Sequence, residues 1–247
     1  MMESKTINQV KKILTKCIDG AIRRASKNKS FRPFHEALLS TEVVNLSSFE
    51  RSFSTSFGQG PIEEISFLIA RDNGYNVVRQ KQTLVNVYKG AVDEIERILS
   101  GLRTGERKPD WEKEVQKITA FKKGDTEVRR VITDLWLEKD DIQTYMSIKT
   151  VKPNLDQTEI AKKDLLLLKA HDINYKTYFA LFYNPGGSQR KDYNWSIPSK
   201  IFDMQKDTCV LIGEDYWDYL GGSGSYSSLL KLFKEVGHKT QERIRNL

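Results

Sequence analysis

An aspartate and a lysine lie in two apolar stretches of this chain that have the pattern of neighbouring strands. Asp134 is inside "VRRVITDLWL", and Lys149 follows Ile148 in "YMSIKT". A carboxylate can hold a divalent metal, and a nearby lysine can position water and stabilise a developing anion, so the pair fits metal-dependent phosphodiester hydrolysis. The two side chains would lie side by side if the strands pair across the acidic turn "EKDDIQ".

A simpler interpretation of the same two residues remains open. An Asp and a Lys on paired strands are most often a solvated cross-strand ion pair. The residues that follow favour a functional role, because Lys152 adds a second cation and a helix begins soon after it, with Asp156 near its N-cap. Helix N-termini attract anions, so we expect a phosphate-binding site at this strand end.

The elements that must position these residues form three stretches of one 247-residue domain. Residues 1–58 have the spacing of amphipathic helices, the second of which is expected over about 35–57. Residues 59–184 alternate helices and strands and form the expected catalytic core. Residues 185–247 hold a strand, a Gly-rich loop and a terminal helix that ends at about Gly237.

Within the core, a helix is expected over 61–74, because a proline opens it and a glycine closes it. The stretches 75–88 and 90–102 follow, and their patterns do not decide between helix and strand. Further along, the leucine-rich stretch 156–172 predicts a helix, and "KTYFALFYN" predicts a buried strand.

Composition narrows the class of protein. Forty Lys and Arg residues against 33 Asp and Glu give a net charge of +7, which fits either a polyanionic partner or a slightly basic surface. Two cysteines without a CxxC pair, and three histidines without an HExxH motif, argue against a disulfide framework and a zinc site. We expect a cytoplasmic protein, because this cysteine usage fits a reducing compartment. No apolar run approaches the roughly 20 residues that span a membrane.

Three stretches, in the same order, resemble the TdeIII-type family of type II restriction endonucleases. They are "ERSFSTSFGQGPIEEISFLIA", "SIKTVKPNLDQTEIAK" and "EDYWDYLGGSGSYSSLLKLFKEVG". Asp134, followed by a strand that ends in "SIK", also looks like the PD-(D/E)XK nuclease signature with Lys149 as its lysine. The resemblance covers most of the chain, from about residue 47 to residue 237.

The resemblance implies an α/β fold with a restriction-endonuclease-like core, in which helices flank a mixed β-sheet, and a helical N-terminal extension. It implies a type II site-specific deoxyribonuclease that uses Mg²⁺ and cuts double-stranded DNA, at a GGNCC-like site, as a homodimer. It also implies a cognate methyltransferase in the same restriction-modification system.

Ser147 departs from the nuclease signature, which has Asp or Glu there as the second metal ligand. Serine is neutral, and Mg²⁺ prefers carboxylates and water. Related nuclease cores take an acid from the helix before the sheet, where this chain has Glu63 and Glu64. The resemblance therefore implies that Asp134 binds metal with one of these two glutamates, Glu63 first, while Lys149 assists catalysis. Acids are also favoured in any first helical turn, which is the alternative explanation for both glutamates. Glu159 and Gln157, on the helix after the lysine strand, are weaker candidates for the second ligand.

Sequence-specific binding needs side chains that reach base edges. The stretch "GGSQRKDYNW" offers several beside aromatic residues, although an ordinary solvated loop would have the same composition. We expect DNA contacts from Lys152, Asn154, Gln157, Gln189, Arg190, Lys191 and Asn194. Ser147 leaves a rival function open, that of a nuclease-fold protein which binds DNA and no longer cuts it.

Overall fold

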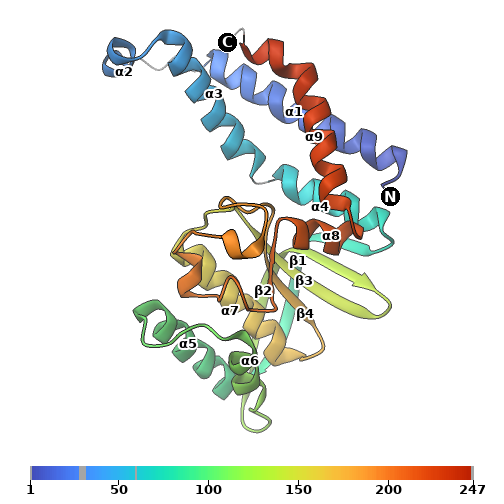
Figure 1. Cartoon of the computed structure of the whole chain (residues 1–247). Helices are drawn as coiled ribbons and strands as arrows, with labels where there is room; N and C mark the ends of the chain where they lie inside the picture. The colour runs from blue at the N-terminus through green and yellow to red at the C-terminus, as the bar shows by residue number, and fades with distance from the viewer. Residues whose placement is uncertain (1, 28–31, 59, 246–247) are drawn as a thin grey trace.

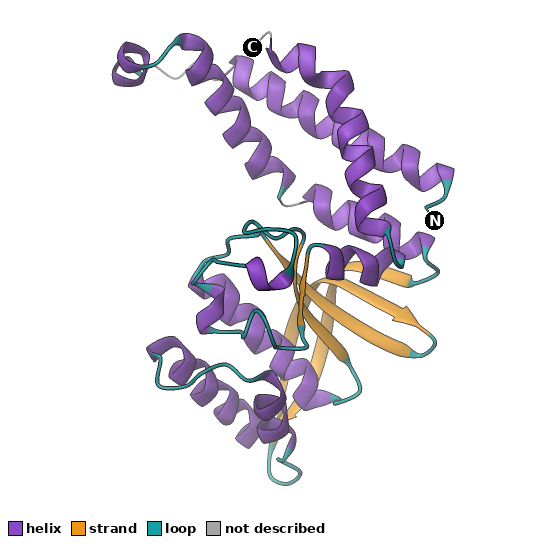
Figure 2. Cartoon of the chain, in the orientation of Figure 1, coloured by secondary structure: helices purple, strands orange, loops and turns teal. Residues whose placement is uncertain are grey.

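A five-stranded sheet lies at the centre of the molecule, whose computed structural model describes residues 2–27, 32–58 and 60–245. Its strands follow the chain order from edge to edge: β1 (Asn76–Tyr88), β2 (Thr126–Lys139), β3 (Ile142–Lys149), β4 (Lys176–Leu181) and β5 (Val210–Ile212). The first three strands pair antiparallel and the last three pair parallel. Helices cover both faces of the sheet (Figure 2), which confirms the expected α/β fold with a mixed sheet.

One face of the sheet is covered by three helices: α5 (Lys89–Thr104), α6 (Trp111–Thr119) and α7 (Leu155–His171). The apolar residues of α5 recur at helical spacing, and its side chains at Ile95 and Ile98 are almost fully buried. Each such side chain contributes about 1.5–3 kcal/mol on burial. This face forms one core cluster with Val131 of β2 and Phe179 of β4.

The opposite face carries α4 (Gly60–Asp72), α8 (Glu214–Gly221) and α9 (Ser225–Arg245). Beyond them lie α1 (Ser4–Lys27), α3 (Thr41–Phe57) and the short α2 (Pro33–Leu38). Figure 1 shows α1, α3 and α9 as a helical layer on one side of the sheet, with α5 and α6 on the far side of the molecule. The expected helical N-terminal extension is therefore present.

Near the middle of the strand pair β1–β2, the positions of the core side chains shift from one face of the sheet to the other. Residues an even number apart on a strand normally share a face. Val131 nevertheless belongs to the α5–α7 cluster, while Leu135 belongs to the α4–α8 cluster. The same exchange occurs in β1 between Val77 and Val85. Both exchanges flank Gln80, a non-glycine residue with a φ of 51°, which lies opposite Asp134 in the strand register.

The turn between β2 and β3 brings the two strands of interest together. Lys139 pairs with Ile142, and the two residues between them, Asp140 and Asp141, have φ values of 53° and 61°. Two successive positive φ values are typical of the type I′ hairpin turn, whose twist matches that of the strands. The expected pairing across "EKDDIQ" is thus confirmed.

Several boundaries differ from the sequence-based expectations. Residues 35–57 hold two helices rather than one, because the chain is extended at Leu39 and Ser40, and the Ser40 side chain caps α3. The helix α9 continues beyond Gly237 to Arg245. The N-cap of α7 is Asn154, and Asp156 lies in the first turn, near the N-cap as expected. In the described part of the chain, no helix is both long and apolar enough to cross a membrane.

Candidate active site

Asp134 and Lys149 meet at the point where β2 separates from β3. Leu135 pairs with Met146, so Asp134 lies one step beyond the last registered pair, opposite Ser147. The Oδ2 atom of Asp134 accepts a hydrogen bond from the backbone N–H of Ile148 at 2.7 Å and lies 3.1 Å from Nζ of Lys149. Both side chains are half-buried, with exposed fractions of 20% and 23%. This pair is therefore more shielded from water than the surface ion pair of the simpler interpretation.

Ser147 contributes little to the geometry. Its hydroxyl lies 3.5 Å from Oδ2 of Asp134, at the limit of hydrogen bonding. The residue is buried, and it follows Met146, which packs on the α4 side of the sheet. Ser147 is close enough to orient a water molecule beside Asp134, but it brings no charge.

A second carboxylate approaches Asp134 from the helix before the sheet. The Nε2 atom of Gln80 donates to Oε2 of Glu63 at 3.0 Å and to Oδ1 of Asp134 at 3.4 Å. Arg79 also approaches Glu63, with its guanidinium 3.6 Å from the same Oε2 atom. The helix α4 turns Glu63 toward the sheet because its Ile62 and Ile65 are buried in the core. One amide nitrogen thus joins two acids from different elements.

Glu64 is placed differently. It is exposed and lines a cavity of about 570 Å³, together with residues of α1, α3 and β1. Successive helical residues are about 100° apart, so only one of the two glutamates can face Asp134. The Gln80 amide connects Glu63 to Asp134, whereas Glu64 lines the cavity beside α1.

Two residues near this site were not singled out from the sequence. Gln80 holds a left-handed backbone conformation that usually favours glycine, and such conformations cluster at functional sites. Asp164, on α7, is half-buried, and burial raises its pKa to about 6. Lys149 and Lys163 pull that pKa down, while the charge of Asp134 pushes it up. A polar residue beside the run of four leucines in α7 is the sequence signal that could have marked Asp164.

These donors fit a divalent cation of the Mg²⁺ type. Mg²⁺ sites usually draw on one or two carboxylates, water and substrate phosphate. Glu63 and Asp134 supply two carboxylates, and the Gln80 nitrogen between them shows that both can turn toward one positively polarised group. In residues 2–27, 32–58 and 60–245, no group of three or more His, Cys, Asp or Glu side chains is arranged to hold a metal. Glu63 and Asp134 are the two acids that Gln80 joins at the candidate site.

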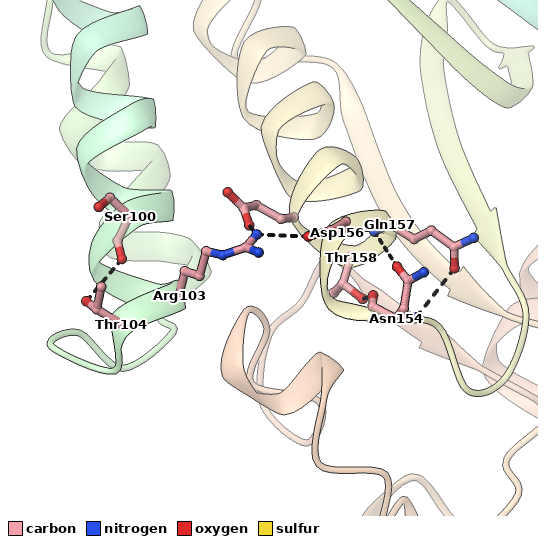
Figure 3. A network of polar contacts seen from close by, with 8 residues as sticks. Ser100, Arg103, Thr104, Asn154, Asp156, Gln157 and Thr158 are labelled. Atoms are coloured by element: carbon pink, nitrogen blue, oxygen red, sulfur yellow. Dashed lines mark hydrogen bonds and ion pairs between the residues drawn. The ribbon is translucent and has the colours of Figure 1, made fainter.

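The predicted phosphate-binding residues after Lys149 cap the next helix. Asn154 accepts from the backbone N–H of Gln157 at 2.8 Å, and Gln157 accepts from that of Asn154 at 3.4 Å (Figure 3). Arg103 of α5 binds Asp156 and Glu159 at 2.9 and 2.6 Å, which ties α5 to α7.

Lys152 is exposed, and its ammonium lies 5.3 Å from the ring centre of Trp195. The Trp195 ring in turn donates to the carbonyl of Pro153, so this aromatic residue fixes the strand end beside the lysine. Lys152 therefore keeps its charge available at the surface near the candidate site.

The loop with the remaining predicted DNA contacts includes a short 3₁₀ helix, Arg190–Asp192. Lys191 and Asn194 are exposed there, and Gln189 caps the turn. Arg190 donates from Nε to the carbonyl of Met204 at 2.7 Å and from a terminal nitrogen to that of Asp207 at 2.5 Å. A base contact by Arg190 would require these two bonds to open.

The chain is similar in sequence to type II restriction enzymes. Residues 2–237 match the family model described as "Type II restriction endonuclease, HinfI". The chain is 28% identical over 235 residues to the type II restriction enzyme HgiCII of Herpetosiphon aurantiacus, covering 92% of this chain and 85% of HgiCII. It is 29% identical over 230 residues to HgiEI of the same organism, covering 89% and 82%. Similarity extends to MjaII of Methanocaldococcus jannaschii, at 27% identity over 224 residues, 77% of this chain and 58% of MjaII.

Proposed function

The chain belongs to the HinfI family of type II restriction endonucleases, and from that premise we propose that Glu63, Asp134 and Lys149 form its Mg²⁺-dependent catalytic site. As a member of the family, it is a site-specific deoxyribonuclease. The observation that carries the proposal is the convergence of two carboxylates, from α4 and β2, beside the ammonium of Lys149.

Each side chain has a role that follows from its contacts. The N–H of Ile148 and the ammonium of Lys149 both bind Oδ2 of Asp134, which leaves Oδ1 turned toward Gln80 and Glu63. Glu63 and Asp134 would hold Mg²⁺ through these oxygens. The ion would activate water as a Lewis acid and offset the negative charge of the phosphate. Lys149 would orient the attacking water and stabilise the negative charge that develops on the phosphate.

The finer classification is also a proposal. The three stretches that resemble the TdeIII-type family, and the order of Asp134 and Lys149, support a PD-(D/E)XK nuclease in which Glu63 replaces the acid absent at Ser147. We propose that residues 1–247 act as one nuclease domain, in a homodimer, because a two-fold dimer can cut both strands of a palindrome. A GGNCC-like site, a partner methyltransferase and a cytoplasmic location belong to the same proposal.

For recognition, we propose that the loop at Gln189, Lys191 and Asn194 reaches base edges, and that Lys152 contacts phosphate. Lys191 and Asn194 are exposed and carry hydrogen-bonding groups of the kind that read bases. Arg190 is a weaker member of this set, because its guanidinium already binds two backbone carbonyls. The side-chain oxygens of Asn154 and Gln157 cap the backbone N–H groups at the start of α7, so the amide NH₂ groups of these two side chains would make the proposed DNA contacts.

The rival function, DNA binding without cleavage, rests on the neutral side chain at Ser147. The contact of Gln80 with both acids argues against it, since Glu63 supplies the charge that Ser147 lacks. A site with Asp134, Glu63 and Lys149 has the donors that hydrolysis needs.

Plasmid DNA incubated with Mg²⁺, or with a chelator, tests the proposal. The wild-type chain should give discrete fragments with Mg²⁺ and none with the chelator. Lys149→Ala should lose cleavage yet retain DNA in a gel shift with Ca²⁺, while Lys176→Ala, an exposed lysine of β4, should cut normally. Cleavage by Lys149→Ala near the wild-type rate would make the Lys149–Asp134 contact purely structural. Specific retention by a wild-type chain that never cuts would support the rival.

A further inference from the structure

One side of α1 carries a row of exposed cations. They are Lys5, Lys12, Lys16, Arg23 and Lys27. Successive members are seven or four residues apart, and both steps return a helix to nearly the same side. The five side chains therefore lie within an arc of about 60° along the helix surface. We call this row the α1 basic stripe.

The stripe is not neutralised within the described part of the chain. None of the five side chains has a hydrogen bond or ion pair with another described residue. Asp19 is the acidic residue of α1, and its carboxylate binds Arg243 of α9 at 2.8 Å. Cations four residues apart on a helix repel each other, as Lys12 and Lys16 do here, so the stripe lowers the intrinsic stability of α1.

The other cations of this region are placed differently. Lys11 binds Glu235 of α9 at 2.8 Å. Arg24 donates to the hydroxyls of Ser52 and Ser56, both at 2.8 Å, and so joins α1 to α3. Lys11 and Arg24 thus join α1 to α9 and α3, whereas the five side chains of the α1 basic stripe are exposed to solvent.

The length of the stripe suits double-stranded DNA. From Lys5 to Lys27 the helix rises about 33 Å at 1.5 Å per residue. One turn of B-DNA is about 34–36 Å long and carries a phosphate row on each strand. A straight line of cations of this length can therefore follow the phosphates of roughly one helical turn, without reading any base.

The stripe is also continuous with the candidate active site. Lys12 and Lys16 line the cavity of about 570 Å³ whose lining also includes Pro61 of α4 and Arg79 of β1. Arg79 is the residue whose guanidinium lies 3.6 Å from Glu63. The cavity lining, which also includes Glu64, thus places cations of α1 and Arg79 between the surface of α1 and Glu63.

We propose that the α1 basic stripe binds the phosphate backbone of the DNA duplex that flanks the cleaved site. This inference rests on the proposed function, since it names the surface that holds the substrate. The contact is independent of sequence and strongly dependent on salt, because each phosphate contact releases condensed counterions. The stripe would raise affinity for any duplex, and base contacts elsewhere would select the site.

The test compares two triple variants with the same charge change. The first is Lys12→Gln, Lys16→Gln and Arg23→Gln. The control is Lys117→Gln, Lys122→Gln and Lys123→Gln, three exposed residues at the α6 side of the molecule, far from α1 (Figure 1). Dissociation constants for a mixed-sequence duplex of about 30 bp, roughly three turns, are measured with Ca²⁺ at several salt concentrations. Circular dichroism confirms that all the proteins are folded.

The stripe variant should bind more weakly, and the slope of log K against log salt should fall by about 2–3, since each lost phosphate contact removes about 0.9. The control variant should keep the wild-type slope. An unchanged slope in the stripe variant would overturn the proposal. So would a loss of self-association in sedimentation at unchanged DNA affinity, because the stripe would then face a second copy.

A failure of the proposed function is distinguishable from a failure of this inference. If the wild-type chain neither binds nor cuts DNA, the proposed function is wrong, and the proposal that the stripe binds DNA is wrong as well. If the wild-type chain cuts with Mg²⁺ and the stripe variant keeps the wild-type salt slope, only the stripe inference is wrong.

Discussion

Replacing Asp164 by asparagine should stabilise the protein. Asp164 lies on α7 in a half-buried position, and burial raises its pKa from 3.8 to about 6, although Lys149 and Lys163 oppose the change. At neutral pH Asp164 is charged, and its charged form has a higher free energy in the folded protein than in the unfolded chain. Asparagine has nearly the same shape and no charge to desolvate.

The size of the effect follows from the pKa. The difference between 3.8 and about 6 corresponds to about 3 kcal/mol of unfolding free energy as an upper limit, since Asp164 keeps some contact with water. A folded-state pKa above the unfolded one means that the folded state binds the proton more tightly. Stability is thus highest below pH 3.8 for this group and is lost as the pH rises through about 6.

The assay is urea unfolding at several pH values without divalent metal, with Asp93→Asn on the exposed face of α5 as the control. Asp164→Asn should gain up to about 3 kcal/mol at pH 8, roughly half of that near pH 5 and little at pH 4. The control should change by less than about 0.5 kcal/mol. A pH-independent difference, or a destabilised variant at pH 8, would refute the electrostatic explanation.

Three further substitutions test other contacts. Glu114→Ala removes the carboxylate 2.5 Å from the fully buried ammonium of Lys162, which keeps its hydrogen bond to the carbonyl of Ile201 but loses this counter-charge. The free energy of unfolding in urea should therefore fall by about 3–5 kcal/mol, and a loss below about 1 kcal/mol would contradict this. Asn154→Ala removes the cap of α7 and should cost about 1 kcal/mol, while an Asp at the same position should preserve it. Gln80→Ala removes the amide that lies between the two acids, so Ca²⁺ should raise the melting temperature of this variant more than that of the wild type. Gln82→Ala is the control. An equal rise in Gln80→Ala and the wild type, or an equally large rise in Gln82→Ala, would contradict a role for the Gln80 contact.

The hairpin that holds Asp134 and Lys149 could be predicted because its information is local. Alternating apolar residues define both strands, and two acidic residues define the turn between them, so the contact at 3.1 Å follows from strand pairing. The helix that carries Glu63 was predictable for the same reason, since a proline and a glycine bound its apolar stripe.

The strand β1 could not be predicted, because its residues do not keep one side to the core. Val77 and Val85 pack on opposite faces of the sheet, with Gln80 in a left-handed conformation between them. This exchange removes the period of two on which strand prediction depends. The role of Gln80 depends on a tertiary contact 54 residues away in the chain, which no local pattern encodes.

Local patterns also cannot say how a polar side chain is used. Arg190 has the residue type that reads guanine, yet the fold directs its guanidinium to the carbonyls of Met204 and Asp207. Glu63 and Glu64 are adjacent and chemically identical, and only the orientation of α4 on the sheet separates them.

The adjacent glutamates offer the most direct test of the central claim, that Glu63 and Asp134 form one metal site beside Lys149. The measurement is the rate of DNA cleavage across a Mg²⁺ titration in Glu63→Gln and Glu64→Gln. The two variants carry the same chemical change at neighbouring positions of one helix. Glu63→Gln should cut on the order of 10²-fold more slowly or need far more Mg²⁺, while Glu64→Gln should follow the wild-type curve. Wild-type cleavage by Glu63→Gln at low Mg²⁺, or an equal loss in both variants, would contradict the account.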